Sequence, residues 1–354
     1  MKKPFKRFFN TILALLIIIV IAVCGGVVYL TVTEYSPETV ENVDVFGTPT
    51  TEVLPGDKIK VMTYNIGSAV KTAGSDWYED GGSGVRAESK DSVDETLGAI
   101  AKLCTDRKAH VNFFQEADVD ARRSYSTDEA SFLSGAVPGR ASTFAYDFKC
   151  TWVPLPLPVG MGGVTSGSLT LTRFGPDSAE RVALPEDSGW PSGTWSRKPG
   201  LLVSRTKLGD STKQLVLINL NLSKYDDGSV RKAQYTSLCE FMQMEFAKGN
   251  YVIAGGSFNA ALPSASAGPD DETDVYTTLP LSTDNLTGGW KYCTDDSTAT
   301  MRLAEAPLGS EAKTFVTDGF ITSPNTIVEN TETIDTLFAY SDHNPVVTDV
   351  TLVK

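Results

Sequence analysis

Cysteine and histidine are scarce in this chain, and their scarcity removes several kinds of site. The 354 residues include five cysteines and two histidines. Four of the cysteines, Cys104, Cys150, Cys239 and Cys293, lie 46, 89 and 54 residues apart, a spacing that matches no compact zinc-binding pattern. In an oxidising location they allow two disulfides, and free buried thiols fit the sequence equally well.

Positive charge is also in short supply. The chain has 31 Lys and Arg residues against 44 Asp and Glu residues, a net charge of −13. Residues 1–36 hold four of the basic residues and one of the acidic ones, so the remainder carries 27 against 43, a net charge of −16. Such a surface repels polyphosphate backbones unless a cation intervenes. This composition disfavours a basic nucleic-acid binder and leaves a divalent-metal site open.

One long apolar run stands apart from the rest. Residues 12–32 contain no charged residue and follow a basic flank, residues 1–11. At about 1.5 Å per residue, a helix of this length covers the roughly 30 Å hydrocarbon core of a bilayer. A cleaved signal peptide is the alternative, but its apolar region is usually only about 7–15 residues long. We expect an uncleaved single-pass anchor, with a cytoplasmic N-terminus and an extracytoplasmic C-terminal domain because the basic flank is N-terminal.

The rest of the chain divides into a linker and one domain. Residues 33–57 are rich in Pro, Thr and acidic residues and are interpreted as a stalk. Residues 58–354 alternate short apolar runs with two helical patterns, which is typical of a layered α/β domain. The helices are expected from Ser92, at a Ser-Val-Asp-Glu capping box, and over Ser229 to Lys248. Strands are expected over 58–66, 111–115, 168–173, 201–205, 214–222, 251–254, 315–322 and 345–352.

Six short motifs carry the chemistry, most of them at the ends of predicted strands. In chain order they are TYNIG (63–67), QEAD (115–118), INLNLS (218–223), GGSFN (255–259), TDGFITS (317–323) and SDHNPV (341–346). Together they resemble the endonuclease/exonuclease/phosphatase superfamily of metal-dependent phosphoesterases, over roughly residues 58 to 353. The resemblance implies a four-layered α/β sandwich, two packed mixed sheets flanked by helices, with the site at one sheet edge.

Part of the family's site is intact. Phosphodiester hydrolysis needs a divalent cation, an activated water and a proton for the leaving oxygen. By resemblance, Glu116 and Asn65 hold Mg²⁺ or Mn²⁺, for which carboxylate and amide oxygens are suitable ligands. By resemblance also, His343 lies at the scissile phosphate, with Asp318 as its orienting carboxylate and Asp342 as a further acidic partner. Asn259 also matches the family's pattern.

Two catalytic positions are replaced. Asn221 stands where the family has a histidine, and Ser257 stands where it has an aspartate. An amide does not titrate near neutral pH, and a serine hydroxyl supplies neither the charge nor the basicity of a carboxylate. Because general acid or base catalysis typically contributes about 10² to 10⁴-fold per group, we expect a large loss of rate. The second histidine, His110, precedes a predicted strand outside all six motifs, and we assign it a structural role.

Three functions fit these residues. The first is a membrane-anchored, extracytoplasmic phosphoesterase whose activity is lost or severely reduced, by natural decay or by deliberate inactivation. The second is a surface module that binds a phosphorylated ligand or a protein partner without chemistry. The third is an active enzyme that uses altered groups. The expected partners are a phosphorylated small molecule, a phospholipid head group or nucleic acid, and nothing in the sequence indicates an obligate oligomer.

Overall fold

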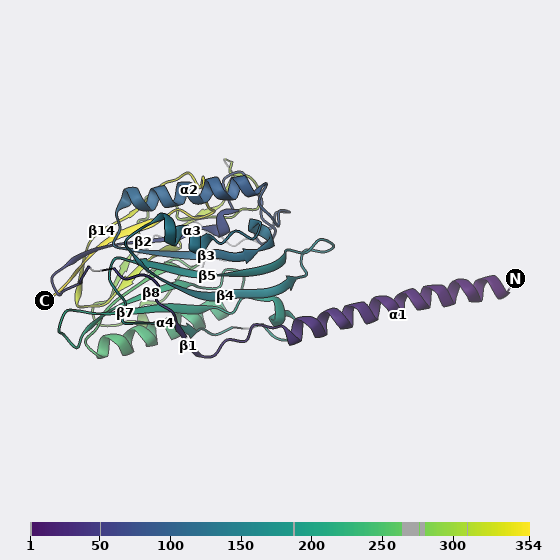
Figure 1. Cartoon of the computed structure of the whole chain (residues 1–354), viewed down its shortest axis with the longest axis horizontal. Helices are drawn as coiled ribbons and strands as arrows, with labels where there is room; N and C mark the ends of the chain where they lie inside the picture. The colour runs from purple at the N-terminus through teal and green to yellow at the C-terminus, as the bar shows by residue number, and fades with distance from the viewer. Residues whose placement is uncertain (1, 50, 187, 264–275, 277–279, 310) are drawn as a thin grey trace.

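The chain begins with one long apolar helix. The computed structural model describes residues 2–49, 51–186, 188–263, 276, 280–309 and 311–354. Helix α1 (Lys2–Val32) extends away from the rest of the molecule (Figure 1). The most apolar 18 residues of its segment Phe5–Val32 have a mean hydropathy of 3.1 and are not buried. The helix is therefore long and apolar enough to cross a membrane, a property that it shares with signal sequences.

Two mixed sheets form the body of the domain. The first has the strand order β1-β6-β7-β8-β9-β13-β10 and the second has the order β14-β15-β2-β3-β5-β4. The first sheet consists of β1 (Val40–Val43), β6 (Ser178–Ala183), β7 (Gly200–Lys207), β8 (Gln214–Asn221), β9 (Tyr251–Ser257), β13 (Asp318–Thr322) and β10 (Lys291–Cys293). The second consists of β14 (Thr326–Thr333), β15 (Val346–Leu352), β2 (Lys58–Asn65), β3 (Val111–Ala121), β5 (Gly162–Thr172) and β4 (Ala141–Val153). Two short strands, β11 (Met301–Arg302) and β12 (Thr314–Phe315), pair with each other.

Helices cover the outer faces of both sheets. Helices α2 (Lys90–Arg107) and α3 (Glu129–Ala136) bury apolar side chains such as Leu97 and Leu133 against the six-stranded sheet. Helix α4 (Ser229–Ala247) buries Leu238 and Met242 against the seven-stranded sheet. Five short 3-10 helices lie in the loops: η1 (Gly67–Ala69), η2 (Tyr78–Asp80), η3 (Arg122–Ser124), η4 (Ser192–Trp195) and η5 (Thr283–Asn285). Figure 1 shows α2 and α4 on opposite sides of the two sheets.

The central core lies between the two sheets. Phe113 of β3 packs there with Leu217 of β8, Ile253 of β9 and Phe320 of β13, and all four are fully buried. Successive side chains of a strand point to opposite faces, so alternate residues of these strands enter this layer while the others pack on the outer side of the sheet. The predicted four-layered α/β sandwich preceded by one apolar helix is therefore confirmed.

Several local predictions need correction. The segment predicted as a stalk is not free of the domain: Val40–Val43 pair antiparallel with β6, and Val53 is buried in the central core. The capping box of α2 uses Ser89 as the N-cap and Ser92 three residues later, so the helix begins before Ser92. Strands β1, β4, β6, β10, β11 and β14 and helix α3 were not predicted, and β4 and β14 carry many polar or exposed residues. The five cysteines, all within the described residues, are free thiols.

Candidate functional site

Strand register gathers the motif residues at one edge of the sandwich. Strands β8 and β9 run parallel and pair Asn221 with Ser257, and β9 and β13 pair Ser257 with Asp318. In the second sheet, parallel β2 and β3 pair Asn65 with Gln115, which places Glu116 next to Asn65. Because the carboxyl ends of neighbouring parallel strands meet at the same edge, residues distant in sequence converge there.

Glu116 reaches the site through an irregular backbone. The pairing of β3 with β5 shifts register between Phe114 and Ala117, and Glu116 within this bulge has a φ of 55°. Asn259, which follows β9, has a φ of 50°. Positive φ is uncommon for residues other than glycine and gathers at functional sites, where the surrounding structure imposes it. Gly256 has a different reason for its identity, because a Cβ there would lie 1.9 Å from the Leu220 carbonyl oxygen.

His343, Asp318 and Ser257 form one hydrogen-bonded chain. His343 Nδ1 lies 2.9 and 3.1 Å from the two carboxylate oxygens of Asp318, and because a carboxylate can only accept, Nδ1 carries a proton. The Ser257 hydroxyl donates to Asp318 Oδ1 at 2.6 Å. Burial lowers the pKa of His343, but the charges of Asp318 and Asp342 outweigh it, and the pKa is raised. Ser257 is fully buried, so its hydroxyl is not presented to a ligand.

Two amide side chains donate hydrogen bonds to Glu116, and a third amide supports one of them. Asn65 Nδ2 donates to Glu116 Oε1 at 3.3 Å and Asn221 Nδ2 donates to the same oxygen at 3.4 Å. The orientation of Asn65 is fixed because its Oδ1 accepts from the Gly67 backbone N–H at 3.0 Å. Asn259 Nδ2 donates in turn to Asn221 Oδ1 at 3.2 Å. Asn65 therefore turns its nitrogen, not its oxygen, toward Glu116.

Two cations also contact Glu116. Lys71 Nζ lies 3.1 Å from Glu116 Oε2, and Arg197 Nη2 lies 3.2 Å from Glu116 Oε1. The Lys71 side chain is almost completely buried, whereas the Arg197 side chain is 29% exposed. Both oxygens of this carboxylate are thus held by positively charged side chains.

These pairs continue into a chain of alternating charges, which we call the ion-pair chain. Beyond Lys71 it continues to Asp342 Oδ2 at 3.6 Å, from there to Lys224 Nζ at 3.7 Å and on to Asp80 Oδ1 at 2.7 Å. Beyond Arg197 it ends on Asp147 Oδ2 at 3.7 Å. In order, the chain is Asp147, Arg197, Glu116, Lys71, Asp342, Lys224 and Asp80.

The electrostatics favour the charged forms of Lys71, Glu116 and Asp80, whereas burial raises the pKa of Asp147 at the end of the ion-pair chain. Burial alone disfavours the charge of Lys71, but Asp342 and Glu116 outweigh burial and raise its pKa. Burial likewise opposes ionisation of Glu116, yet Arg197 and Lys71 hold its pKa well below the usual range. Asp80 behaves in the same way, with its pKa lowered mainly by Lys224 against the effect of burial. Buried charges are tolerated only when paired in this manner.

This arrangement does not fit a divalent cation. A magnesium or manganese ion prefers several oxygen ligands, but Glu116 already faces Lys71 and Arg197, and Asn65 presents a nitrogen. Among the described residues, no group of three or more His, Cys, Asp or Glu side chains is placed to hold a metal ion. The expected ligand pair of Asn65 and Glu116 is therefore adjacent in space, but it is arranged as an ion-paired and hydrogen-bonded unit.

A groove leads to this cluster from the surface. A cavity of 50 Å³ lies against Glu116, Asn221 and Asn259, and it shares Arg197 and Lys224 with an adjoining groove of 580 Å³. Aromatic side chains line the groove, among them Tyr78, Phe148, Trp195 and Tyr225. The inner cavity is comparable with about two water molecules of ~30 Å³ each, so the deeper residues are almost closed off.

Sequence reasoning missed the cations of this site. Lys71 follows η1, Arg197 follows η4, and Lys224 lies just after β8, so all three come from loops between the motif strands. Lys224 directly follows the INLNLS motif, which is the one local signal that pointed toward it. His110 lies outside the site, where its Nδ1 accepts from the Lys60 backbone N–H at 3.0 Å, in agreement with a structural role.

Comparison with known proteins supports the fold. No protein-family model matches the sequence, and no curated protein matches it. An endonuclease/exonuclease/phosphatase protein from Beutenbergia cavernae DSM 12333 is similar in structure, with a TM-score of 0.54 and 17% identity over 84% of this chain and 72% of that one. One from Bacteroides vulgatus gives a TM-score of 0.54 at 14% identity, over 84% and 99% of the two chains.

A third solved structure has been determined with an anion. The human Nocturnin catalytic domain with bound sulfate has a TM-score of 0.52 and 18% identity, over 88% of this chain and 98% of that one. At such low identities the likeness concerns the fold, and the order of the six motifs agrees with it. The chain has the fold of the endonuclease/exonuclease/phosphatase superfamily.

Proposed function

We propose that this protein is a membrane-anchored, extracytoplasmic protein of the phosphoesterase fold that binds a phosphorylated ligand without hydrolysing it. Helix α1 serves as an uncleaved anchor, because its uncharged run, residues 12–32, is longer than a signal-peptide core and follows basic residues. The same asymmetry leaves the N-terminus cytoplasmic. The sandwich domain then lies outside.

The observation that carries this proposal is the pairing of Glu116 with Lys71 and Arg197. In the fold's metal-dependent chemistry, a cation offsets charge on the phosphoryl oxygens and polarises the attacking water. Here both oxygens of Glu116 are already held by side-chain cations, at 3.1 and 3.2 Å. A metal ion would have to displace a nearly buried lysine whose positive charge is stabilised by two carboxylates.

The acid and base groups are impaired as well. Asn221 and Ser257 hold the places expected of His and Asp, and both side chains are committed to hydrogen bonds inside the site. His343 remains paired with Asp318, but it is only 2% exposed. Neither Asn221 nor Ser257 can take a proton from water near neutral pH, so the two replaced positions supply no base to activate it.

The groove suits a small phosphorylated ligand better than nucleic acid. Arg197 and Lys224, where the groove meets the inner cavity, are the groups that we expect to face a phosphate. The outer groove carries the carboxylates of Glu79, Glu186 and Asp227, which repel a polyanion. A phosphorylated small molecule or a phospholipid head group satisfies both features, because it places one phosphate at the cations.

Hydrolysis and binding assays on the full chain in detergent test the proposal. With Mg²⁺ or Mn²⁺ we expect no hydrolysis of bis-p-nitrophenyl phosphate above a Glu116→Gln variant. In EDTA we expect calorimetric binding of p-nitrophenyl phosphate, weakened about tenfold or more by Arg197→Gln, since a charge-assisted bond contributes about 1.5–3 kcal/mol.

Matched variants make the result decisive. Arg107→Gln removes an exposed cation at the end of α2 and should leave binding unchanged, whereas Arg197→Lys should retain part of it. Metal-dependent turnover that disappears in Glu116→Gln would show an active enzyme and contradict the proposal. A folded chain that binds no phosphate ester would equally remove it.

A further inference from the structure

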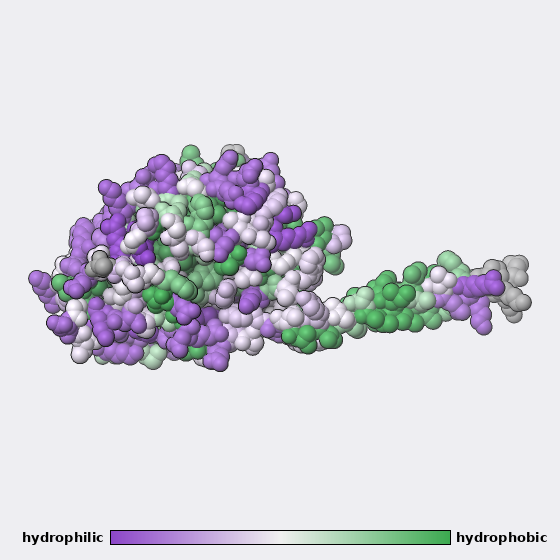
Figure 2. Space-filling model, in the orientation of Figure 1, coloured by the Kyte–Doolittle hydropathy of each residue, from purple (hydrophilic) through white to green (hydrophobic). Residues whose placement is uncertain are grey.

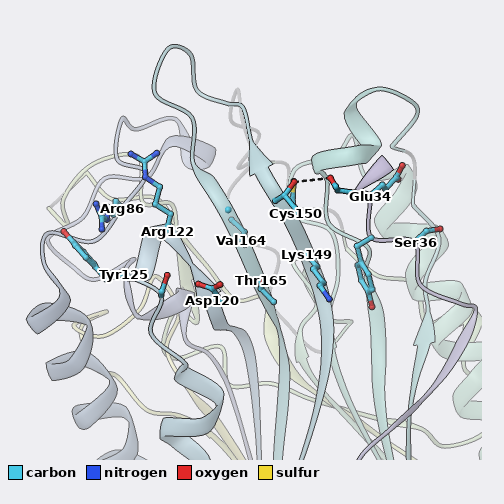
Figure 3. Close-up of a pocket in the computed structure, with 15 residues that line it drawn as sticks. Glu34, Ser36, Arg86, Asp120, Arg122, Tyr125, Lys149, Cys150, Val164 and Thr165 are labelled. Atoms are coloured by element: carbon cyan, nitrogen blue, oxygen red, sulfur yellow. Dashed lines mark hydrogen bonds between the residues drawn. The ribbon is translucent and has the colours of Figure 1, made fainter. Parts of the chain in front are cut away.

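A second pocket lies at the foot of α1, away from the ion-pair chain. This foot pocket has a volume of 710 Å³, and its walls are residues 33–36, 149–151 and 163–165 together with side chains from two neighbouring loops (Figure 3). Residues 33–36 directly follow the apolar helix. Thr33 Oγ1 lies 3.2 Å from Thr151 Oγ1, and Trp190 Nε1 donates to Thr31 Oγ1 at 3.1 Å, so the end of α1 is attached to the domain.

The position of the foot pocket follows from the helix. If α1 spans a bilayer to Val32, then Thr33 and Glu34 lie within about 7 Å of the hydrocarbon edge, at no more than ~3.6 Å per residue. The head-group layer of one leaflet is about 5–7 Å thick. The wall of the foot pocket formed by Thr33 and Glu34 therefore lies at the depth of the lipid head groups.

Apolar side chains surround this end of the domain. The loop between β4 and β5 projects in the direction of α1, beyond the point where the helix joins the domain (Figure 1). Leu157 in this loop is 78% exposed and Trp190 is 71% exposed, and Trp152, Leu155 and Val159 are also exposed. Figure 2 shows apolar surface at the end of the domain nearest α1. Tryptophan and leucine at such a place are typical of residues that sit in the membrane interface.

Three cations face the foot pocket without carboxylate partners. Arg86 stacks 3.7 Å above the ring of Tyr125, Arg122 lies 5.9 Å from the ring of Trp152, and Lys149 lies 5.1 Å from the ring of Tyr146. Within the part of the chain that the structure describes, none of the three forms an ion pair within 4.0 Å.

The carboxylates of the foot pocket do not cancel this charge. Glu34 is already paired with Lys198 at 3.0 Å, which leaves Asp120 as the other acidic residue in the wall. Three cations against one uncompensated carboxylate is an unusual balance in a chain with a net charge of −13. The aromatic rings are neutral partners for these cations, and although Arg122 Nη1 donates to the Gly160 carbonyl oxygen at 3.4 Å, none of the three charges is neutralised by the ring that it faces.

We infer that the foot pocket binds the phosphate head group of an anionic membrane phospholipid, while the β4–β5 loop and Trp190 rest in the bilayer interface. The inference concerns a site separate from the groove, and it rests on the proposed role of α1 as an anchor. Arg122 and Lys149 contact the phosphate, and Arg86 adds to the positive field. The lipid would fix the domain against the membrane in one orientation.

Short-chain lipids test this on the full chain extracted in a nonionic detergent. Dihexanoyl-phosphatidylglycerol, dihexanoyl-phosphatidylcholine and inorganic phosphate are titrated separately by thermophoresis. We expect the phosphatidylglycerol to bind at least tenfold more tightly than the other two. The variant R86Q/R122Q/K149Q should lose roughly 10²-fold in affinity, because each cation near an anionic head group contributes about fivefold.

Control variants separate charge from folding. K102Q/K207Q/K313Q removes three exposed lysines elsewhere and should bind as the native chain does, and R122K/K149R should retain binding. Equal affinity for phosphatidylcholine, equal affinity for inorganic phosphate, or an unaffected triple variant would each overturn the inference. Failure of the anchor itself is distinguishable, because the native chain would then appear in the soluble fraction of a cell lysate.

A second measurement tests whether the β4–β5 loop and Trp190 lie in the bilayer interface. In nanodiscs with brominated acyl chains, Trp152 and Trp190 should account for most of the quenched tryptophan emission, so that quenching falls in Trp152→Phe and Trp190→Phe. Trp290→Phe serves as the control, since Trp290 packs against Phe246 beside α4. Quenching that is unchanged in both interface variants would contradict a domain that rests on the bilayer.

Discussion

Lys71 Nζ lies 3.1 Å from Glu116 Oε2 and 3.6 Å from Asp342 Oδ2, so one nearly buried lysine joins two carboxylates of the candidate site. In the metal-dependent chemistry that the motifs imply, a cation neutralises carboxylates in this place. Here an ammonium group from the loop after η1 supplies that positive charge. The site is thus charge-compensated by the chain itself.

Removal of this ammonium should destabilise the domain. Lys71→Met leaves Asp342 with Lys224 and Glu116 with Arg197, and breaking a buried pair typically costs about 3–5 kcal/mol. The free energy of unfolding in urea measures the effect. Lys102→Met, which breaks an exposed pair with Asp106, is the control and should change stability little. Equal effects of the two substitutions would show that the buried contact is not a source of stability.

Divalent metal should leave the native domain unaffected. A ligand present at 100 times its dissociation constant stabilises a protein by about 2.7 kcal/mol, which raises the unfolding midpoint by several degrees. With Lys71 and Arg197 on Glu116, we expect neither millimolar Mg²⁺ nor EDTA to move the midpoint of thermal unfolding. A metal-dependent rise that disappears in Glu116→Gln would contradict the assignment.

The two histidines should respond to pH with opposite sign. Burial lowers the pKa of His343 but Asp318 and Asp342 raise it overall, so its stabilisation is complete below about pH 6.5 and is lost as pH rises through the raised pKa. The pKa of His110 is lowered by burial and by Arg173, so its contribution is present above about pH 6.5 and is lost as pH falls through the lowered pKa.

The free energy of unfolding, measured between pH 5 and pH 9, tests the direction of the pH dependence for each histidine. The stability difference between the native chain and His343→Gln should shrink as pH rises, and the difference for His110→Gln should grow. Because the chain has only these two histidines, each variant leaves one imidazole to be followed by NMR. Parallel pH profiles for the two variants would show that the Asp318 contact does not hold the charge on His343.

The sequence indicated the position of the candidate site better than the charged side chains that surround Glu116. Asn65, Asn221 and Ser257 end β2, β8 and β9, whereas Glu116 lies at the bulge inside β3 and Asp318 begins β13, and strand pairing brings all five to one edge. Their partners arrive from loops, whose course depends on packing between distant segments. No periodicity marks Lys71 or Arg197, and the same limit explains why the pairing of residues 40–43 with β6 was missed.

Restoring activity should require more than the two replaced catalytic groups. Asn221→His with Ser257→Asp supplies an imidazole and a carboxylate, but Lys71 and Arg197 still hold Glu116. We expect this double variant to show little hydrolysis of bis-p-nitrophenyl phosphate in Mn²⁺. Addition of Lys71→Ala frees one oxygen of Glu116 and should raise the metal-dependent rate by about 10²-fold or more, the scale of one acid or base group.

Glu116→Gln in that triple variant is the control and should abolish the gain, because the amide replaces the carboxylate that a metal would need. The rate is read as p-nitrophenol release by chains whose folding is checked by circular dichroism. A double variant already as active as the triple would mean that Lys71 is no barrier to catalysis. The loss of function would then lie in Asn221 and Ser257 alone, and the pairing of Lys71 with Glu116 would be a consequence of that loss and not a second cause.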